Sequence, residues 1–324
     1  MKIKNNKKIF ITAEIGLNHN NNYKKTIKLI NLAIKAGANA VKFQLFQTKS
    51  LFAENSKEYF FVKKYETKFN FFKKIFIYCK KKNIICYASP FDDFSISFLK
   101  KIKNPIYKWA SSEIDKLNNL QKVAKTKKKI IISTGMANEN DIKKAISICK
   151  KNKNYNLVLM HCVSLYPQPI KEANLNKLES LKKFGFEIGF SDHSESNISA
   201  VVAVAKGARY IEKHITWNKR DKGPDHFYAC EIKEFKKYVE AINLASYSLG
   251  NSELEYDKKI VFATRRKSYH SKRKIKKNEK LKLVDIFLKQ NLAGINLNEI
   301  KSYIGKKFKK DILKNSPLKK HYFR

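Results

Sequence analysis

The strongest constraint on the fold is a repeated alternation of short apolar runs with amphipathic helical segments. Eight runs rich in β-branched residues predict strands at residues 9–14, 40–44, 84–89, 106–110, 130–134, 157–162, 188–191 and 210–215. Helical patterns lie between them or after them, at residues 23–36, 69–82, 117–126, 140–150, 175–184, 198–206 and 232–249. Strand–helix units joined by short connections predict an α/β fold, a closed (β/α)8 TIM barrel.

The alternation ends near residue 250, and the rest of the chain has a different pattern. The chain has 324 residues, which leaves room for one small module beyond a barrel of roughly 250 residues. A polar joint is followed by an apolar segment at residues 275–288 and a stretch from 294 to 318. We therefore expect two domains, a barrel over residues 1–262 and a small domain over residues 263–324.

The sequence gives no sign of export or of a metal-binding cysteine motif. No run approaches 18 apolar residues, and the lysine-rich start leads into the first strand without an apolar leader, so we expect a cytoplasmic protein. The five cysteines are odd in number and scattered, and none forms a C-x-x-C pair. This pattern is typical neither of a disulfide framework nor of a structural zinc site.

The formal net charge of +41 raises the alternative of a charge-driven partner, either nucleic acid or an anionic surface. Only six of the 69 basic residues are arginine, which is the residue favoured for bidentate contacts to bases. Lysines such as Lys24, Lys25 and Lys28 fall on polar faces of expected helices. We predict no nucleic-acid partner and no membrane partner, although so positive a field should attract anionic substrates at low salt.

Polar side chains stand at the end of every predicted strand, where barrels of this type build their active sites. They are Glu14, Lys42, Gln44, Ser89, Lys108, Ser111, Glu113, Ser133, His161, Ser164, Ser191, His193, Lys213 and His214. Burying an ionisable group costs several kcal/mol unless it is paired or binds a charged ligand, so convergence from many strands is hard to explain as core filling. The pattern predicts a functional pocket at the barrel mouth.

The residue types at the barrel mouth predict a ligand that carries more than one anionic group. Lys42 and Lys108, with the hydroxyls of Ser111, Ser133 and Ser191, are suited to a phosphate and a carboxylate on one small molecule.

Other polar residues of the mouth predict a metal site and acid–base groups. His193 and His214 follow neighbouring strands and are suited to sharing a divalent cation, whereas His19 and His161 are more typical of core residues. Glu14 and Glu113 are candidates for acid–base work. Asp225 is either a turn residue or a substrate ligand.

Several ordered motifs carry a family resemblance. They read Ala13-Glu-Ile-Gly-Leu-Asn-His-Asn, Val41-Lys-Phe-Gln, Ala88-Ser-Pro-Phe-Asp, Lys108-Trp-Ala-Ser-Ser-Glu, Ile132-Ser-Thr-Gly-Met, His161-Cys-Val-Ser-Leu-Tyr-Pro, Gly189-Phe-Ser-Asp-His-Ser, Glu212-Lys-His-Ile-Thr and Gly223-Pro-Asp-His. Together they resemble the N-acetylneuraminate (sialic acid) synthase family, with its legionaminate and pseudaminate synthase relatives. Residues from about 265, including Ile275-Lys-Lys-Asn-Glu and Ile304-Gly-Lys-Lys, resemble that family's C-terminal antifreeze-like (SAF) domain.

The resemblance implies a transferase that condenses phosphoenolpyruvate with the open-chain form of an amino sugar, and a domain-swapped homodimer. It implies a divalent metal, Mn2+ or else Mg2+ or Co2+, at His193 and His214. It assigns catalysis to Glu14 and Glu113 and the sugar to Gln44, Tyr166 and Asp225. Phosphoenolpyruvate would contact Lys42, Lys108, Ser111, Ser133, Ser164 and Ser191.

The chain departs from the family pattern in its small domain. Where relatives bring an Arg-Pro pair toward the partner's sugar pocket, residues 288–294 read Leu-Lys-Gln-Asn-Leu-Ala-Gly, and lysine does not replace a planar guanidinium group. Three acceptors are considered, N-acetylmannosamine, a diacetamido-dideoxy hexose and a phosphorylated hexosamine. The first two are favoured because the sequence shows no additional Arg-rich phosphate site. The rival enzyme class is a 3-deoxy-octulosonate-phosphate type synthase that also uses phosphoenolpyruvate.

Overall fold

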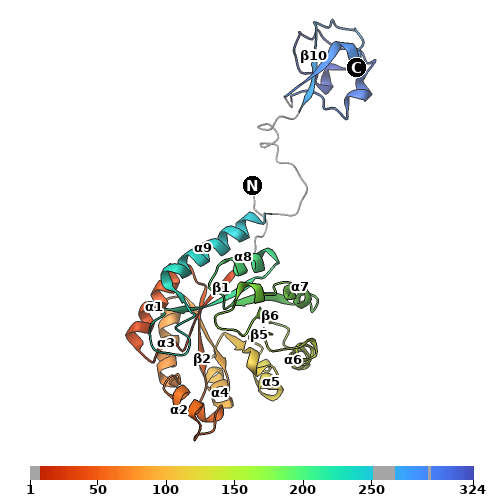
Figure 1. Cartoon of the computed structure of the whole chain (residues 1–324). Coiled ribbons are helices and arrows are strands. Elements are labelled where there is room, and N and C mark those ends of the chain that lie inside the picture. The colour runs from red at the N-terminus through yellow and green to blue at the C-terminus, as the bar shows by residue number, and fades with distance from the viewer. Residues whose placement is uncertain (1–7, 251–266, 291–292) are drawn as a thin grey trace. The chain divides into compact units, whose positions relative to one another are not determined.

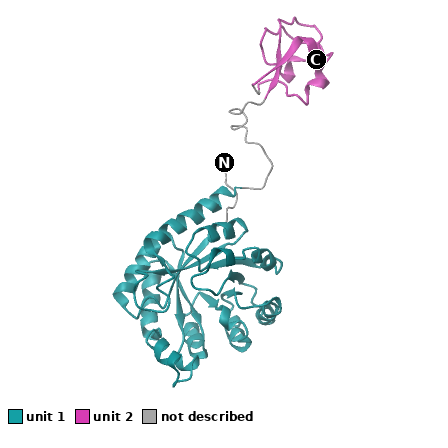
Figure 2. Ribbon diagram, in the orientation of Figure 1, with its two compact units in different colours: residues 1–250 teal, residues 251–324 magenta. Residues whose placement is uncertain are grey.

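A computed structural model describes residues 8–250, 267–290 and 293–324 of the chain. The chain divides into two compact units, residues 1–250 and residues 251–324 (Figure 2). The boundary expected near residue 262 falls outside the described residues, as do Arg265 and Arg266 of the predicted small domain. No helix among the residues described is both long and apolar enough to span a membrane.

The first unit is built around a ring of parallel strands (Figure 1). These strands are β1 (Phe10–Gly16), β2 (Ala40–Leu45), β3 (Ile85–Pro90), β4 (Ile106–Trp109), β5 (Lys129–Ser133), β6 (Leu157–Cys162), β7 (Glu187–Asp192) and β8 (Tyr210–Thr216). They pair in sequence order, and β1 also pairs with β8, with Glu14 opposite His214, which closes the ring. The predicted TIM barrel is thereby confirmed. A short strand, β9 (Cys230–Glu231), continues in parallel beside the end of β8.

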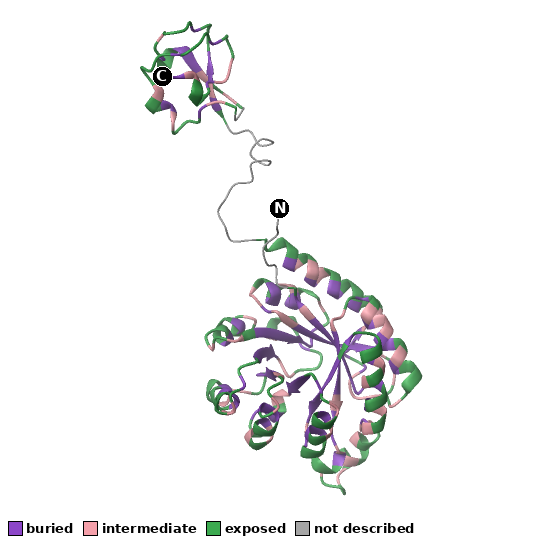
Figure 3. Ribbon diagram, turned by 180° about the vertical axis from the view of Figure 1, so that it is seen from behind, coloured by how far each residue is buried: buried purple, intermediate pink, exposed green. Residues whose placement is uncertain are grey.

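Helices alternate with the strands and cover the outside of the barrel (Figure 1). They are α1 (Tyr23–Lys35), α2 (Lys57–Lys63), α3 (Phe69–Lys81), α4 (Asp93–Lys101), α5 (Leu117–Ala124), α6 (Glu139–Lys151), α7 (Lys177–Lys182), α8 (Ile198–Ala205) and α9 (Ile232–Ser248). Each long helix turns an apolar stripe toward the strands and keeps its lysines in solvent, so strands are buried and outer helix faces exposed (Figure 3).

The alternation of side chains along each strand divides the core into two parts. Outward-facing residues pack under the helices in one large apolar cluster. Inward-facing residues fill the lower part of the barrel, where the cluster consists of Ala40, Tyr87, Ile106, Ile131, Val158 and Met160. Two residues further along β2 and β8, the inward positions become Lys42 and Glu212. The interior is therefore apolar below and ionic toward the C-terminal ends of the strands.

The second unit has a small apolar core of its own. Strands β10 (Ser268–Ser271) and β11 (Ile286–Lys289) form an antiparallel pair. Buried residues from along the unit pack together, among them Ile275, Leu281, Phe308 and Leu318. The described residues of this unit, 267–290 and 293–324, thus form a small apolar core among themselves.

Candidate active site

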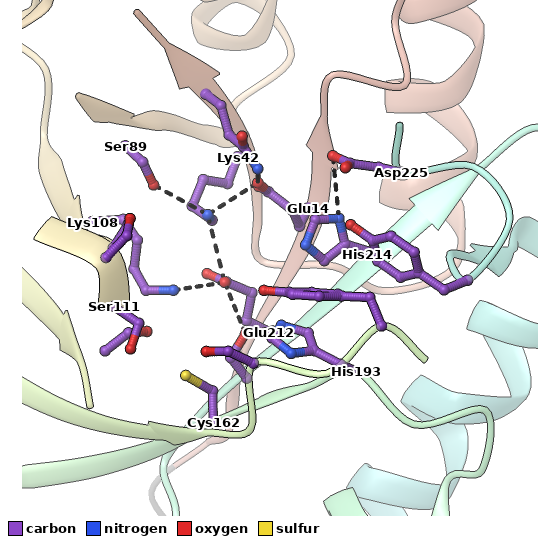
Figure 4. Close-up of a pocket in the computed structure, with 18 of the residues that line it drawn as sticks. Glu14, Lys42, Ser89, Lys108, Ser111, Cys162, His193, Glu212, His214 and Asp225 are labelled. Carbon is purple, nitrogen blue, oxygen red and sulfur yellow. Dashed lines mark hydrogen bonds and ion pairs between the residues drawn. The ribbon is translucent and has the colours of Figure 1, made fainter. Parts of the chain in front are cut away.

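A cavity of about 400 Å³ opens at the C-terminal ends of the barrel strands (Figure 4). Most of the residues predicted from the sequence line it. They are Glu14, Lys42, Gln44, Ser89, Lys108, Ser111, Ser133, Ser164, Tyr166, Ser191, His193, His214 and Asp225. These side chains come from segments distant in the sequence, and closure of the barrel brings them to one place.

Two lysines and two glutamates form a buried ionic network at the base of the cavity (Figure 4). The Nζ atom of Lys42 lies 3.0 Å from Oε1 of Glu14 and 3.5 Å from Oε1 of Glu212. The Nζ atom of Lys108 lies 2.6 Å from the same oxygen of Glu212. Lys42 also donates to the hydroxyl of Ser89 at 3.3 Å. The second carboxylate oxygen of each glutamate has no hydrogen-bond partner among the described residues.

Burial and ion pairing act in opposite directions on these groups. Burial raises the pKa of Glu14 above its ordinary value, against the pull of Lys42. Burial would also raise the pKa of Glu212, but Lys108 and Lys42 outweigh it and lower that pKa to about 2. For Lys42 the two carboxylates overcome burial and raise the pKa, whereas burial lowers the pKa of Lys108 despite Glu212. Lys108 is therefore the more easily neutralised of the two amines.

Two imidazoles face the same cavity beside the ionic network. The ring centroids of His193 and His214 lie 5.7 Å apart, with 62° between the ring planes. Burial lowers the pKa of His193 to about 3, and burial also lowers the pKa of His214 to about 4. Both rings are therefore neutral at physiological pH and carry a lone pair. Nδ1 of His193 donates to the carbonyl of Val163 at 2.7 Å, which leaves Nε2 unprotonated.

The two histidines suit a divalent cation that takes further ligands from elsewhere. Nδ1 of His214 is buried, has no hydrogen-bond partner among the described residues, and lies 3.8 Å from Oδ2 of Asp225. Within the described ranges, no group of three or more His, Cys, Asp or Glu side chains is arranged to hold a metal. The site thus offers two neutral nitrogen ligands, and the remaining positions would be open to water or substrate.

Apolar and aromatic side chains also line the cavity. They are Phe91, Met136, Pro224, Phe227 and Tyr228. Met136 and Phe227 are 62% and 56% exposed, so they stand at the rim in this structure. A guest would therefore meet charge at the base of the cavity and the side chains of Met136 and Phe227 at its rim.

Three of the strand-end residues point away from the cavity. Glu113 is not a lining residue; its Oε2 lies 2.8 Å from Nζ of Lys116, and burial raises its pKa. His161 faces outward, where Nε2 lies 2.8 Å from the carbonyl oxygen of Ala173. Lys213 also faces the helix layer and pairs with Asp192. The strand alternation that points His214 inward points its neighbour Lys213 outward.

The main residue that strand-end reasoning missed is Glu212. It lies inside β8 and not at its end, and it pairs with both lysines. The alternation of side chains along a strand could have revealed it, because Glu212 lies two residues before His214 and so shares the inward face of β8. Cys162, whose buried thiol also lines the cavity, follows the same rule on β6.

Comparison with known proteins shows which family the chain belongs to. The NeuB family profile matches residues 29–254, well over half of the chain. The chain belongs to the NeuB family. It is 36% identical over 336 residues to the pseudaminic acid synthase of Campylobacter jejuni, covering 98% of this chain and 97% of that protein. It is 35% identical over 321 residues to the N,N'-diacetyllegionaminic acid synthase of the same organism, covering 93% and 96%.

A solved NeuB-type structure supports the same assignment. The N-acetylneuraminic acid synthetase of Leptospira borgpetersenii, crystallised with citrate, superposes with a TM-score of 0.75 at 37% identity. The match covers 80% of this chain and 91% of the other. NeuB-family synthases condense phosphoenolpyruvate with amino sugars, so the chain is an enzyme of the transferase class. Synthases of this family are generally metal-dependent.

Proposed function

We propose that this NeuB-family enzyme joins phosphoenolpyruvate to the aldehyde carbon of an open-chain, unphosphorylated N-acetylated amino sugar, giving a nine-carbon sialic-acid-type keto acid and phosphate. One observation carries the proposal: two buried lysines share carboxylates at the base of a cavity that also holds two neutral imidazoles. When a substrate binds, the two lysines at the bottom of the cavity can exchange their contacts with Glu14 and Glu212 for contacts with the anionic groups of the substrate.

The anionic substrate would lie at the base of the cavity. Phosphoenolpyruvate carries a phosphate and a carboxylate, and Lys42 and Lys108 supply two cations for them. The hydroxyls of Ser111, Ser133, Ser164 and Ser191 line the same wall as additional donors. Binding would replace the long 3.5 Å contact between Lys42 and Glu212 with contacts to the substrate.

The reaction balances with water as the third reactant. C3 of phosphoenolpyruvate attacks the sugar aldehyde carbon, whose oxygen takes up a proton and becomes a hydroxyl. Water adds at the cationic C2, and the resulting tetrahedral intermediate breaks its C–O bond to phosphate, giving the 2-keto acid. Glu14, whose pKa is raised by burial, is suited to holding one of these protons. The carboxylate of Glu113 pairs with Lys116 and does not line the cavity, so the geometry does not support its predicted role in handling water.

A divalent cation such as Mn2+ would be held by His193 and His214 and would polarise the aldehyde of the sugar. The chain's own contribution is to keep both rings neutral by burial, so that each presents a lone pair. Val163 fixes the tautomer of His193 through its carbonyl.

The sugar would occupy the outer part of the cavity, near Gln44, Tyr166 and Asp225. The only cationic side chains that line the cavity, among the described residues, are Lys42 and Lys108 at its base. A phosphorylated sugar would therefore lack a counter-charge near the entrance. Apolar lining residues such as Phe91 favour a sugar with methyl groups, either N-acetylmannosamine or a diacetamido-dideoxy hexose.

The second unit is proposed to be an antifreeze-like domain that serves a partner subunit. Its separate apolar core and its sequence resemblance support this assignment. The resemblance further implies a domain-swapped homodimer working in the cytoplasm. Sedimentation of the purified protein checks the dimer, and a monomer at micromolar concentration would contradict it.

The decisive experiment is to incubate the protein with phosphoenolpyruvate, Mn2+ and single sugars from a panel. The panel contains N-acetylmannosamine, its 6-phosphate and 2,4-diacetamido-2,4,6-trideoxy hexoses. Mass spectrometry should identify a keto acid with loss of phosphate for an unphosphorylated sugar. Turnover of the 6-phosphate alone would contradict the proposed acceptor, and no keto acid from any sugar would contradict the proposed reaction.

A further inference from the structure

A buried polar network lies behind the two histidines, on the helix side of the barrel wall. Asp192 ends β7 and is the register partner of Lys213 on β8. Their exposed fractions are 0% and 4%, and Nζ of Lys213 lies 3.1 Å from Oδ2 of Asp192. Neither residue lines the cavity. In sequence, however, each directly precedes one of the histidines that do, His193 and His214.

The carboxylate of Asp192 holds the backbone on both sides of His193. Its Oδ1 accepts hydrogen bonds from the backbone N–H of Ser194 at 2.9 Å and from the Ser194 hydroxyl at 2.7 Å. This closes an Asx-type turn with His193 at its centre. The carbonyl of His193 accepts from the N–H of Gln168 at 2.9 Å. The position of the His193 backbone is thus defined by neighbours in sequence and in space.

Lys213 and helix α9 tie this turn to β8. The ammonium of Lys213 donates to the carbonyl of Ser194 and lies 5.1 Å from the ring centroid of Tyr238. The hydroxyl of Tyr238 donates to Oδ2 of Asp192 at 3.0 Å. One ion pair therefore connects the ends of β7 and β8 and the helix that covers them.

We infer that Asp192, Lys213 and Tyr238 are positioning residues that fix the spacing of His193 and His214 for a shared cation. This inference rests on the metal site of the proposed function. Metal–ligand distances tolerate deviations of only about 0.2 Å, so a small shift of either backbone would spoil the pair of nitrogen ligands. A buried ion pair adds little net stability by itself. We therefore assign this pair the role of fixing the positions of the two histidines.

The test measures the dissociation constant of Mn2+ from the EPR signal of the free ion, together with the melting temperature. Lys213→Met removes the ammonium and should weaken Mn2+ binding by about 10- to 100-fold, as loss of outer-shell partners does at other metal sites. Because this variant leaves the charge of Asp192 buried and unpaired, it is compared with the double variant Asp192→Asn/Lys213→Met, whose amide oxygen can still accept from Ser194. Removing both charges together leaves no buried charge without a counter-ion.

The double variant separates positioning from stabilisation. We expect it to melt close to the native protein and still to bind Mn2+ about 10-fold more weakly or worse. Native Mn2+ affinity in the double variant would assign the ion pair a purely stabilising role and overturn the inference.

A milder pair of variants gives a matched control. Tyr238→Phe removes one hydroxyl from the network and should weaken Mn2+ binding in the same direction. Tyr78→Phe removes a comparable hydroxyl, which donates to Oδ1 of Asn31 at 2.8 Å elsewhere in the helix layer, and should leave Mn2+ affinity unchanged. Equal Mn2+ affinities in both variants would contradict the positioning role but not the metal site. A native protein that binds no Mn2+ would contradict the metal site as well.

Discussion

At the scale of single residues, the two lysines of the cavity are expected to differ in how much they contribute to the binding of phosphoenolpyruvate. Lys108 contacts one carboxylate, at 2.6 Å, whereas Lys42 is shared between two carboxylates and a hydroxyl. Lys108 therefore has fewer competing partners when an anionic substrate arrives. Burial also lowers the pKa of Lys108, so gaining an anionic partner should relieve more electrostatic cost at Lys108 than at Lys42.

Lys108→Ala should accordingly raise the KM for phosphoenolpyruvate much more than the KM for the sugar. A hydrogen bond to a charged group contributes about 1.5–3 kcal/mol, which corresponds to an increase of roughly 10- to 150-fold. Phosphate release at varied concentrations of each substrate measures both constants. Lys122→Ala is the control, because that lysine forms an exposed pair with Asp93 at 2.6 Å. An effect confined to the sugar would reverse the assignment of this end of the cavity.

His214→Ala should abolish the stimulation of phosphate release by Mn2+. The variant removes one of two neutral nitrogen ligands, and a single imidazole holds a divalent cation poorly. Titration of Mn2+ after chelator treatment gives the measurement. His161→Gln is the matched control, because His161 is a buried histidine outside the cavity lining and should leave the Mn2+ response intact. Native turnover that persists in chelator would exclude a catalytic metal.

Residue-level prediction succeeded for polar side chains in the C-terminal part of a strand or just after it, and failed where orientation decides. Ser164 and His193, which follow β6 and β7, were found because barrel mouths collect strand-end polar groups. Glu113 was placed by the same rule, yet its carboxylate turns to Lys116. Glu212 was missed because only its inward orientation, and not its position along β8, reveals it. Pairing between side chains of distant strands is not encoded in local sequence spacing.

At the scale of elements, the strands were predictable to within about two residues because buried parallel strands read as continuous apolar runs. The helices α2 and α4 were not among those expected. Helix α2 has no buried residue, so it lacks the periodic apolar face that predicts a helix. Helix α4 is short and starts directly after β3 through the N-cap Asp92, so its pattern merges with the strand before it.

Helix α6 provides a test of local sequence control. Its N-cap Asn138 accepts from the N–H of Asp141 at 3.0 Å, and the Asp141 carboxylate accepts from the N–H of Asn138 at 3.1 Å. Asn138→Ala should therefore lower the free energy of unfolding by about 0.5–2 kcal/mol. Asn176→Ala is the matched control, because Asn176 precedes α7 without a side-chain capping bond. Urea denaturation measures both variants, and equal losses would show that the capping bonds at α6 do not contribute.

At the scale of the whole molecule, the sequence pattern changes near residue 250, and the structure divides into two compact units after Gly250. The boundary predicted at residue 262 lies outside the described residues. The proposed identity of the small module rests on resemblance and not on physical pattern, because the described residues of the second unit form short strands, short 3-10 helices and irregular segments. Periodicity carries little information for such a unit. Its small core depends on contacts between residues far apart in sequence, such as Ile275 and Ile312.

The net charge of +41 belongs to no single element, and its consequence is a salt dependence for the charged substrate alone. A positive field concentrates phosphoenolpyruvate near the protein, and salt screens that field over about 10 Å at 0.1 M ionic strength. Raising NaCl from about 0.02 to 0.5 M should therefore lower kcat/KM for phosphoenolpyruvate by roughly tenfold at constant free Mn2+. The KM of an uncharged sugar, measured at saturating phosphoenolpyruvate, is the internal control and should change little.

The same salt series with a random DNA duplex separates a lysine-coated enzyme from a nucleic-acid binder, because only a dedicated binder would hold the duplex at physiological salt. Duplex binding that survives there, or a salt-independent kcat/KM for phosphoenolpyruvate, would contradict the view that these lysines act on small anionic substrates through their summed field.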